Sequence, residues 1–309
     1  MTNVVASHDE LRPLMFSIAY RMLGSVAEAE DIVQDAWLRM QNDDTDVRSP
    51  QAYATTVTTR LAIDHLRSAR VRREAYVGSW LPEPLLTTAE DADPAVRAEL
   101  ADTLSMAFLV LLESLSPVER AVFLLREVFG YGYDEIATVV GKSEQNCRQI
   151  FARSKARVDE RRPRFEASRQ KRDELAREFV AASENGDLAA LERLLADDVA
   201  FYGDGGGKAP AIAAPVEGRV RVTRFVLGLF RQAAAMRMVV RPISVNGQPG
   251  IRVLDQGGGL LCVLEMQIAD GRVQALRNML NPDKLRHLGP VGDLGQDRSA
   301  QLLGQAPHQ

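Results

Sequence analysis

One stretch of the chain combines a tight turn with a helix that carries two chemically different faces. Gly141 suits a left-handed turn position, and Ser143 is a good N-cap for the helix that follows. The face predicted to point inward consists of Cys147, Ile150, Phe151, Ser154 and Val158. The face predicted to point outward carries Gln145, Arg148, Gln149 and Ala152, with Arg153 and Lys155 beside it, and Asn146 could join either set.

Amide and guanidinium side chains on one exposed helix face can hydrogen-bond to base edges and phosphates. A helix-turn-helix presents such a recognition helix to the major groove and packs its apolar side on its own domain. The turn, the cap and the division of faces therefore predict DNA binding. An ordinary helical hairpin with a basic surface is the alternative interpretation.

Charge is distributed unevenly along the 309 residues, although the net charge of only −4 seems to argue against nucleic acid. Residues 60–73 hold five arginines against one aspartate, a local charge of +4. Residues 74–102 hold seven acidic side chains against one arginine (−6), and residues 142–172 hold eleven basic against four acidic side chains (+7). Two basic blocks flanking an acidic spacer fit phosphate contact, whatever the total charge. Solvated helix faces are the alternative interpretation of either block alone.

Composition excludes several classes of protein. The longest apolar run, Met106–Leu112, is far shorter than the roughly 20 residues that a membrane-spanning helix needs. The N-terminus lacks a charged-then-apolar signal, so we expect a cytoplasmic protein without membrane contact. Cys147 and Cys262 are too few for a disulfide framework or a complete structural zinc site, and no cofactor is expected.

Helical patterns dominate the first 170 residues, with N-cap signals at Ser25, Ser49 and Ser116. After about Arg172 the pattern changes to α+β. Two amphipathic helices are predicted over residues 174–184 and 188–195, and β-type runs over residues 236–245, 251–254, 260–268 and 273–280.

These modules resemble an extracytoplasmic-function sigma factor of bacterial RNA polymerase. EAEDIVQDAWL at residues 28–38 and AIDHLR at 62–67 match sigma region two, and LSPVERAVFLL at 115–125 leads into the helix-turn-helix of region four. FVAASENGDL at 179–188 and LLADDV at 194–199 look like a SnoaL-like domain of the cone-shaped NTF2-like fold. WLPEP at 80–84, DGGGK at 204–208 and NPDKL at 281–285 resemble the sigma-J-like group, in which the fused domain regulates the sigma part.

The resemblance implies a multidomain fold with two all-α sigma modules and an α+β NTF2-like cone. The expected divisions are region two at 1–75, an acidic linker at 76–101, region four at 102–168, the SnoaL-like domain at 169–290 and a tail at 291–309. Core RNA polymerase and promoter DNA are the implied partners. A one-component helix-turn-helix regulator, switched by a ligand in the cone, is the alternative.

The resemblance also implies roles for particular residues. The surface for core polymerase would consist of Asp31, Gln34, Asp35 and Leu38. Backbone contacts at the minus-ten element would come from Arg60, Arg67 and Arg70, and the loop at residues 41–49 would hold a base flipped from that element. The recognition helix would read the minus-thirty-five element.

An interface between the cone and the sigma modules is expected from the three short motifs. Its candidate residues are Trp80, Pro82, Glu83, Asp204, Gly206, Lys208, Asn281, Pro282, Asp283 and Lys284. Trp80 would be its anchor, because buried aromatic side chains dominate such contacts. The alternative for Trp80 is that it caps local structure within the linker.

The cone leaves open a small-molecule ligand, because NTF2-like cones often enclose an apolar pocket. Enzymatic members need a tuned acid and base inside the pocket. No histidine lies between His65 and His287, which leaves Asp204, Asp255 and Glu265 as candidate bases. We expect no enzymatic activity. DGGGK lacks the full Walker spacing, so a phosphate loop is disfavoured.

Overall fold

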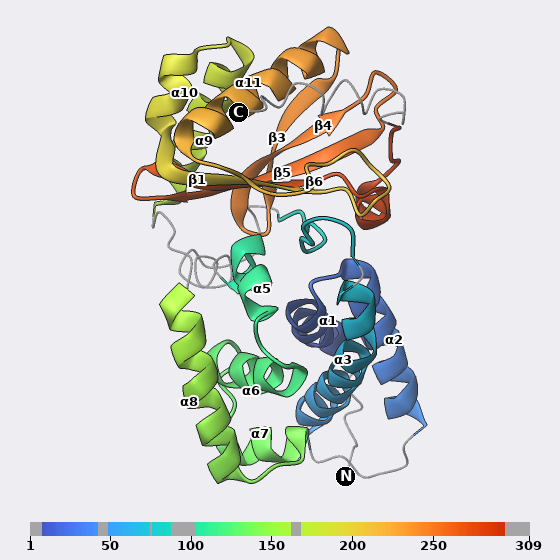
Figure 1. Cartoon of the computed structure of the whole chain (residues 1–309). Coiled ribbons are helices and arrows are strands. Elements are labelled where there is room, and N and C mark those ends of the chain that lie inside the picture. Colours follow the sequence, from blue (N-terminus) through green and yellow to red (C-terminus); the bar gives the residue numbers. More distant parts are fainter. Residues whose placement is uncertain (1–7, 43–48, 75, 88–102, 162–167, 294–309) are drawn as a thin grey trace. The chain divides into compact units, whose positions relative to one another are not determined.

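The chain folds as two compact units, each built from two separate stretches of sequence. The computed structural model describes residues 8–42, 49–74, 76–87, 103–161 and 168–293. The helical unit combines Met1–Glu74 with Phe108–Arg162, and the sheet unit combines Ala75–Ala107 with Pro163–Gln309 (Figure 1). The first part of the linker therefore folds with the C-terminal domain.

The helical unit begins with three helices, α1 (His8–Leu23), α2 (Val26–Gln41) and α3 (Pro50–Glu74). The Ser25 side chain caps α2 by accepting a hydrogen bond from the Glu28 amide at 3.1 Å. The Ser49 hydroxyl accepts one from the Ala52 amide at 3.3 Å, and Pro50 fills the first position of α3. Their shared core is built from buried apolar side chains, among them Met15, Ile18, Leu23, Ala29 and Ile32.

The second part of this unit holds α6 (Pro117–Glu127), α7 (Tyr133–Val140) and α8 (Glu144–Arg161). Helix α5 (Met106–Leu112) precedes them and begins at the end of the sheet unit's first stretch. Ser116 and Glu119 form the predicted capping box at the start of α6. Gly141 ends α7 with φ = +65°, the left-handed conformation that lets the chain turn sharply into α8.

The sheet unit places three helices on one face of a six-stranded sheet (Figure 1). The helices are α9 (Arg169–Glu184), α10 (Leu188–Leu194) and α11 (Arg219–Ala235). The strands are β1 (Leu195–Asp204), β2 (Val216–Glu217), β3 (Val239–Val245), β4 (Gln248–Leu254), β5 (Leu260–Ala269) and β6 (Arg272–Met279). Their order is β2-β1-β6-β5-β4-β3, and the β1–β6 pair is parallel whereas the other neighbours are antiparallel. Two short 3₁₀ turns follow, η1 (Pro282–Lys284) and η2 (Arg286–Leu288).

The predicted α+β class and the later β-type runs are confirmed, but the sequence reasoning missed α11. Its first residues alternate arginine with valine, a period-two pattern that is typical of a strand. Gly218 precedes it and supplies no side-chain cap. The helix forms because Val222, Val226 and Leu227 share one face and are buried in the core between helix and sheet. Packing against the sheet, rather than the local sequence pattern, therefore determines that residues 219–235 form a helix. None of the helices among the described residues is long and apolar enough to cross a bilayer.

Candidate functional site

The recognition helix α8 has the two faces that its sequence predicts. Cys147, Ile150, Ser154 and Val158 are buried, and Phe151 is half-buried against the same core. Gln145, Asn146, Arg148, Gln149 and Arg153 are exposed, so Asn146 belongs to the outward face. Burial raises the pKa of the Cys147 thiol, which fits a packing role. The Ser143 hydroxyl caps the helix through the Asn146 amide at 3.2 Å.

Two cations of this helix already have partners within the helical unit. Arg148 pairs with Glu144 at 2.9 Å and lies over the Tyr133 ring at 5.1 Å, yet its side chain stays exposed. Lys155 is half-buried and pairs with Glu127 at 2.6 Å. Lys155 is therefore less available to a phosphate than the exposed cations near the start of the helix.

The second predicted surface lies on α2. Asp31, Gln34, Asp35 and Leu38 are all exposed, and Leu38 keeps 48% of its surface accessible. Because they are spaced at i, i+3, i+4 and i+7, they share one helix face. Ile32 and Val33 point to the opposite, buried side.

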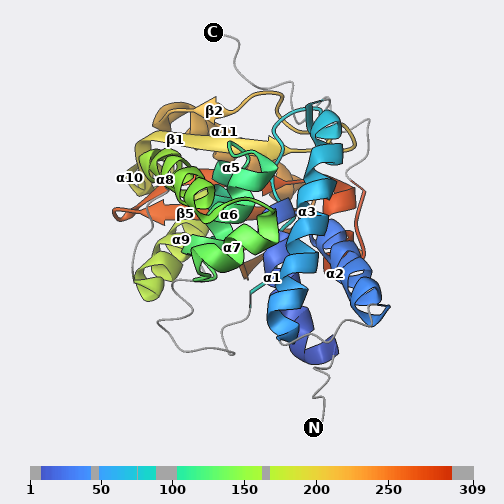
Figure 2. The same ribbon diagram turned by 90° about the horizontal axis from the view of Figure 1, so that it is seen from below.

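Arg60 on α3 makes a contact that the sequence did not predict. Its Nε donates to the carbonyl oxygen of Val139 at 2.9 Å, and its Nη2 donates to that of Thr138 at 2.8 Å. Both carbonyls belong to the last turn of α7, where unpaired carbonyl oxygens and the helix dipole favour a cation. Helix α7 accordingly lies beside α3 in both views of the molecule (Figures 1 and 2).

Two further bonds join the first three helices to the second part of the helical unit. The hydroxyls of Thr55 and Tyr131 are 2.7 Å apart. Arg120, on α6, donates to the Met22 carbonyl oxygen at 2.6 Å. The two predicted DNA-binding modules therefore pack directly against each other. Of the other minus-ten candidates, Arg67 is exposed and pairs with Asp64 at 3.0 Å, whereas the side chain of Arg70 lies outside the described residues, as do residues 43–48 of the predicted base-holding loop.

In the sheet unit, residues 76–87 of the linker (the linker segment) bind to the ends of strands β1 and β6. Asp204, the last residue of β1, is fully buried. Its carboxylate accepts hydrogen bonds from the Tyr76 hydroxyl at 2.5 Å and from the Leu81 amide at 2.8 Å. The Tyr76 pKa is raised by burial and by the hydrogen bond to Asp204, so this hydroxyl keeps its proton as a donor.

Lys284 completes this arrangement, which we call the linker cluster: Tyr76, Trp80, Leu81, Asp204, Asn281 and Lys284. Its ammonium group lies 2.8 Å from the Asp204 carboxylate and 2.6 Å from the Leu81 carbonyl oxygen. The rings of Tyr76 and Trp80 both lie close to this ammonium group, with centroids 4.7 and 4.5 Å from Nζ. Cation–π contact of this kind is strongest where the cation is desolvated, and Lys284 is only 8% exposed.

The neighbouring motif residues support the cluster in different ways. Asn281 donates to the Tyr76 hydroxyl at 2.9 Å. A Cβ on Gly206 would lie 2.1 Å from the Asn281 amide nitrogen, so only glycine allows this approach. Lys208 and Asp283 form an ion pair with each other at the more exposed rim. Pro82 and Glu83 are buried, and Pro282 is the first residue of η1.

A second contact lies at the end of the linker segment. Leu86 pairs with Val245 as an antiparallel bridge, flanked by a bond from the Thr87 amide to the Ser244 carbonyl. The fully buried Asn246 accepts from the Leu85 amide at 2.9 Å and donates to the Leu104 carbonyl oxygen at 2.8 Å. The sequence reasoning missed Asn246 and Tyr76. For Tyr76 the available signal was a second aromatic side chain four positions before Trp80.

None of the three candidate bases lines the apolar cavity that lies between α11 and the sheet. Asp204 belongs to the linker cluster. The Asp255 carboxylate accepts from the amides of Gly257 and Gly259 within a turn, both at 2.8 Å. Glu265 is buried beside Arg277 at 3.2 Å, and neither Glu265 nor Asp255 lines the cavity.

Comparison with known families and proteins agrees with this domain organisation. Residues 8–72 match Sigma-70 region 2, residues 105–158 match Sigma-70, region 4, and residues 176–281 match the SnoaL-like domain. The chain is 36% identical to the ECF RNA polymerase sigma factor SigJ of Mycobacterium tuberculosis (strain ATCC 25618 / H37Rv), over 98% of each chain. It is 31% identical to the probable ECF RNA polymerase sigma factor SigI of Mycobacterium tuberculosis (strain CDC 1551 / Oshkosh), over 89% of this chain and 92% of that protein.

A solved structure extends the likeness to the fold. The crystal structure of Mycobacterium tuberculosis SigJ superposes with a TM-score of 0.72 at 36% identity and covers 89% of this chain and 96% of that one. Both helical regions and the SnoaL-like domain are thus accounted for in one relative. The chain belongs to the family of extracytoplasmic-function RNA polymerase sigma factors.

Proposed function

We propose that this sigma factor binds core RNA polymerase in the cytoplasm and directs promoter-specific initiation of transcription. The exposed face of α2 is the observation that carries the proposal, because a regulator that binds DNA by itself has no use for it. The relatives are named as RNA polymerase sigma factors. A one-component regulator switched by a ligand is accordingly not favoured.

The α2 face suits a protein partner. Asp31 and Asp35 lie one turn apart, and the exposed Leu38 lies about one turn farther along the same face. An apolar contact beside acidic groups fits a basic surface with an apolar centre, since complementary charge guides association and fixes orientation. We assign this face to the core polymerase.

Co-purification tests that assignment. Reversing two charges together, Asp31→Lys with Asp35→Lys, is expected to abolish co-purification of the full chain with core polymerase. The matched control is Glu174→Lys with Glu178→Lys, two carboxylates with the same spacing on α9 of the sheet unit, which should leave co-purification unchanged. Retention of polymerase by the α2 double variant would reject the assignment.

The outward face of α8 would read the minus-thirty-five element. Gln145, Asn146 and Gln149 offer amides for base edges, and Arg148 offers a guanidinium group. Arg153 lies farther along the helix and is placed to contact the phosphate backbone. Arg67 and Arg70 stay assigned to the backbone at the minus-ten element.

The packing of regions 2 and 4 describes a closed state. The two promoter elements are separated by about 25 base pairs, which is roughly 85 Å along B-form DNA. We infer that modules joined through Arg60, Thr55 and Arg120 separate before each contacts its own element. We therefore assign Arg60 first to closing the free protein and only after opening to minus-ten DNA.

The SnoaL-like domain would act in cis by holding the linker segment. An acidic spacer between regions 2 and 4 is expected to lie in a cationic channel of the polymerase. Residues 76–87 cannot lie there while Tyr76 and Leu81 are bound to Asp204. The cone and the polymerase therefore compete for the same segment, and its capture is inhibitory.

Run-off transcription from the cognate promoter tests this regulation. Trp80→Ala and Asp204→Asn, made separately, are expected to raise promoter-specific transcription, because each removes a group that holds the linker segment. Asp197→Asn is the matched control, since Asp197 lies on the same strand as Asp204 but pairs with Arg219. Unchanged transcription in both test variants would reject the regulatory role.

A further inference from the structure

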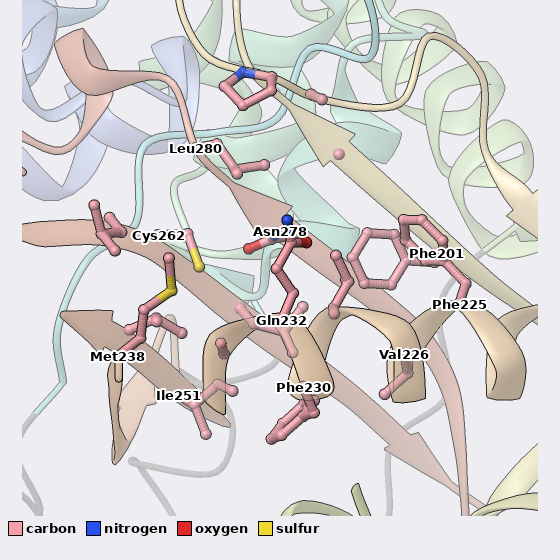
Figure 3. Close-up of a pocket in the computed structure, with 18 of the residues that line it drawn as sticks. Phe201, Phe225, Val226, Phe230, Gln232, Met238, Ile251, Cys262, Asn278 and Leu280 are labelled. Atoms are coloured by element: carbon pink, nitrogen blue, oxygen red, sulfur yellow. The ribbon is translucent and has the colours of Figure 1, made fainter. Parts of the chain in front are cut away.

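The sheet unit contains an apolar cavity between α11 and the helix-covered face of the sheet. Its volume is about 120 Å³. The walls include Phe201, Phe225, Phe230, Met238 and Ile251 (Figure 3). An engineered apolar cavity of about 150 Å³ holds a benzene molecule, so the space matches a compact ring.

Two amide side chains, Gln232 on α11 and Asn278, interrupt these walls, and one of them is buried without a partner for its oxygen among the described residues. Asn278, on β6, is 8% exposed and lines the cavity. Its Oδ1 atom is buried and accepts no hydrogen bond from any described residue. Figure 3 shows Asn278 in the middle of the cavity, with Phe201 and Phe225 on one side and Met238 and Cys262 on the other. A buried acceptor without a donor is costly, and a ligand that supplies the donor would remove that cost.

The lining also defines what charge a ligand can carry. Cys262 is the one titratable residue among the side chains that line the cavity, and burial raises its pKa to about 12. A neutral thiol cannot compensate an ion, and a charge buried without a partner is strongly disfavoured. The cavity therefore selects against carboxylates, phosphates and amines.

We infer that this cavity binds an uncharged, largely apolar molecule with a single compact ring, whose hydroxyl or N–H group donates a hydrogen bond to Oδ1 of Asn278. The aromatic and aliphatic walls enclose the ring. Asn278 fixes its orientation and distinguishes a hydroxylated ring from a plain hydrocarbon. Cys262 takes part only as an apolar surface.

The position of the cavity connects it with the linker cluster. Gly203 and Leu280 line the cavity, and the next residues along the chain, Asp204 and Asn281, hold Tyr76. A ligand seated against these two residues would restrict the strand ends that hold the linker segment. This connection rests on the proposed function, whereas binding itself does not.

Calorimetry on the full chain tests the binding site, with phenol and toluene as probes. Both are expected to bind saturably, and phenol is expected to bind between about 2-fold and 10-fold more tightly, as one net hydrogen bond allows. Asn278→Leu should keep toluene binding and remove the preference for phenol. Failure of both probes to bind, or an unchanged preference in Asn278→Leu, would overturn the inference.

A matched pair of variants on α11 locates the site. Ala233 lines the cavity, whereas its neighbour Ala234 is exposed and does not. Ala233→Phe is expected to fill the space and abolish binding of both probes, and Ala234→Phe should bind them as the unmodified chain does. Equal binding by the two variants would place the probes elsewhere and contradict the inference.

Hydrogen exchange at the Leu81 amide tests the connection with the linker separately. Saturating phenol is expected to slow this exchange, because the Leu81 amide donates to Asp204. If phenol binds but exchange at the Leu81 amide is not slowed, the cavity is a binding site that has no influence on the linker segment. None of these measurements involves polymerase, so their failure is distinct from failure of the proposed promoter function.

Discussion

Two contacts hold distant segments of this chain together, and they are built in opposite ways. In the helical unit, the exposed side chain of Arg60 donates to two neutral carbonyl oxygens at the end of α7. In the sheet unit, Lys284 and Asp204 are buried, and the half-buried rings of Tyr76 and Trp80 contact the Lys284 ammonium group. One contact is polar and faces water, whereas the other is enclosed.

The difference indicates which contact opens more easily. Water can replace the carbonyl partners of Arg60 with little loss, because a protein hydrogen bond exchanged for water contributes only about 1 kcal/mol. Opening the linker cluster also exposes two aromatic rings and separates a buried ion pair. The Arg60 contact should therefore open more readily than the linker cluster, and release of the linker segment should be the controlled step.

The largest expected effect comes from removing the buried cation. Lys284→Met leaves the Asp204 carboxylate buried without its ion pair, and such a loss costs about 3–5 kcal/mol. The free energy of unfolding of the sheet unit, measured by urea denaturation, should fall by that amount. Lys208→Met is the control, because the pair of Lys208 with Asp283 is more exposed and such pairs contribute about 0–1 kcal/mol. Equal losses of unfolding free energy in both variants would show that burial of the Lys284–Asp204 ion pair adds no stability.

A smaller effect is expected at Arg60. Arg60→Met removes two hydrogen bonds between α3 and α7 and should weaken the closed state by about 1–2 kcal/mol. Energy transfer between dyes placed at Gln51 and Ala152, both exposed, should report a larger open fraction. Arg67→Met, which breaks only a pair with Asp64, should leave the transfer efficiency unchanged. An unchanged signal in Arg60→Met would contradict the assignment.

Exposed side chains of α8 should contribute more to DNA binding than the half-buried Lys155 does. Gln149→Ala is expected to weaken binding to the cognate minus-thirty-five sequence by about 1–3 kcal/mol, with little change on a scrambled sequence. Lys155→Ala should have a smaller effect on both sequences, because Lys155 already pairs with Glu127. Titration of labelled duplexes at fixed salt measures both. A larger loss for Lys155→Ala would contradict this division.

The smallest effect concerns pH. Burial raises the pKa of Glu265 above its usual value of 4.5, although Arg277 opposes the shift. The folded state therefore keeps this proton to a higher pH than the unfolded state does. Stability of the sheet unit should fall as pH rises from about 4.5 through the folded pKa, by linkage. Denaturation curves recorded at successive pH values should show a smaller loss of stability in Glu265→Gln. An unchanged loss of stability would mean that other titrating groups cause it.

Local sequence signals predicted the helical surfaces well. The cap at Ser143, the turn at Gly141 and the spacing of Cys147 and Ile150 together determined which side of α8 faces outward. The same holds for Ser116 and Glu119, which form their capping box. In each case, the interacting groups lie within a few residues of one another, where spacing alone determines geometry.

Contacts between distant segments could not be predicted in the same way. Arg60 bonds to carbonyls 78 and 79 residues away, and backbone carbonyls leave no signature in a sequence. The motifs indicated that Asp204 and Lys284 belong together, but the motifs did not include Tyr76, which donates to Asp204. Helix α11 was missed because its alternation of arginine and valine mimics a strand, and only burial against the sheet decides its conformation.

A reversible lock on the linker segment tests the central claim most directly. Leu86 and Val245 are paired as an antiparallel bridge, so cysteines at both positions (L86C with V245C) are placed to form a disulfide. The native thiols of Cys147 and Cys262 have raised pKa values and should not compete. Each single-cysteine variant serves as a control. Run-off transcription by the oxidised double variant should be lost and should return after reduction, whereas equal activity in both states would contradict the account.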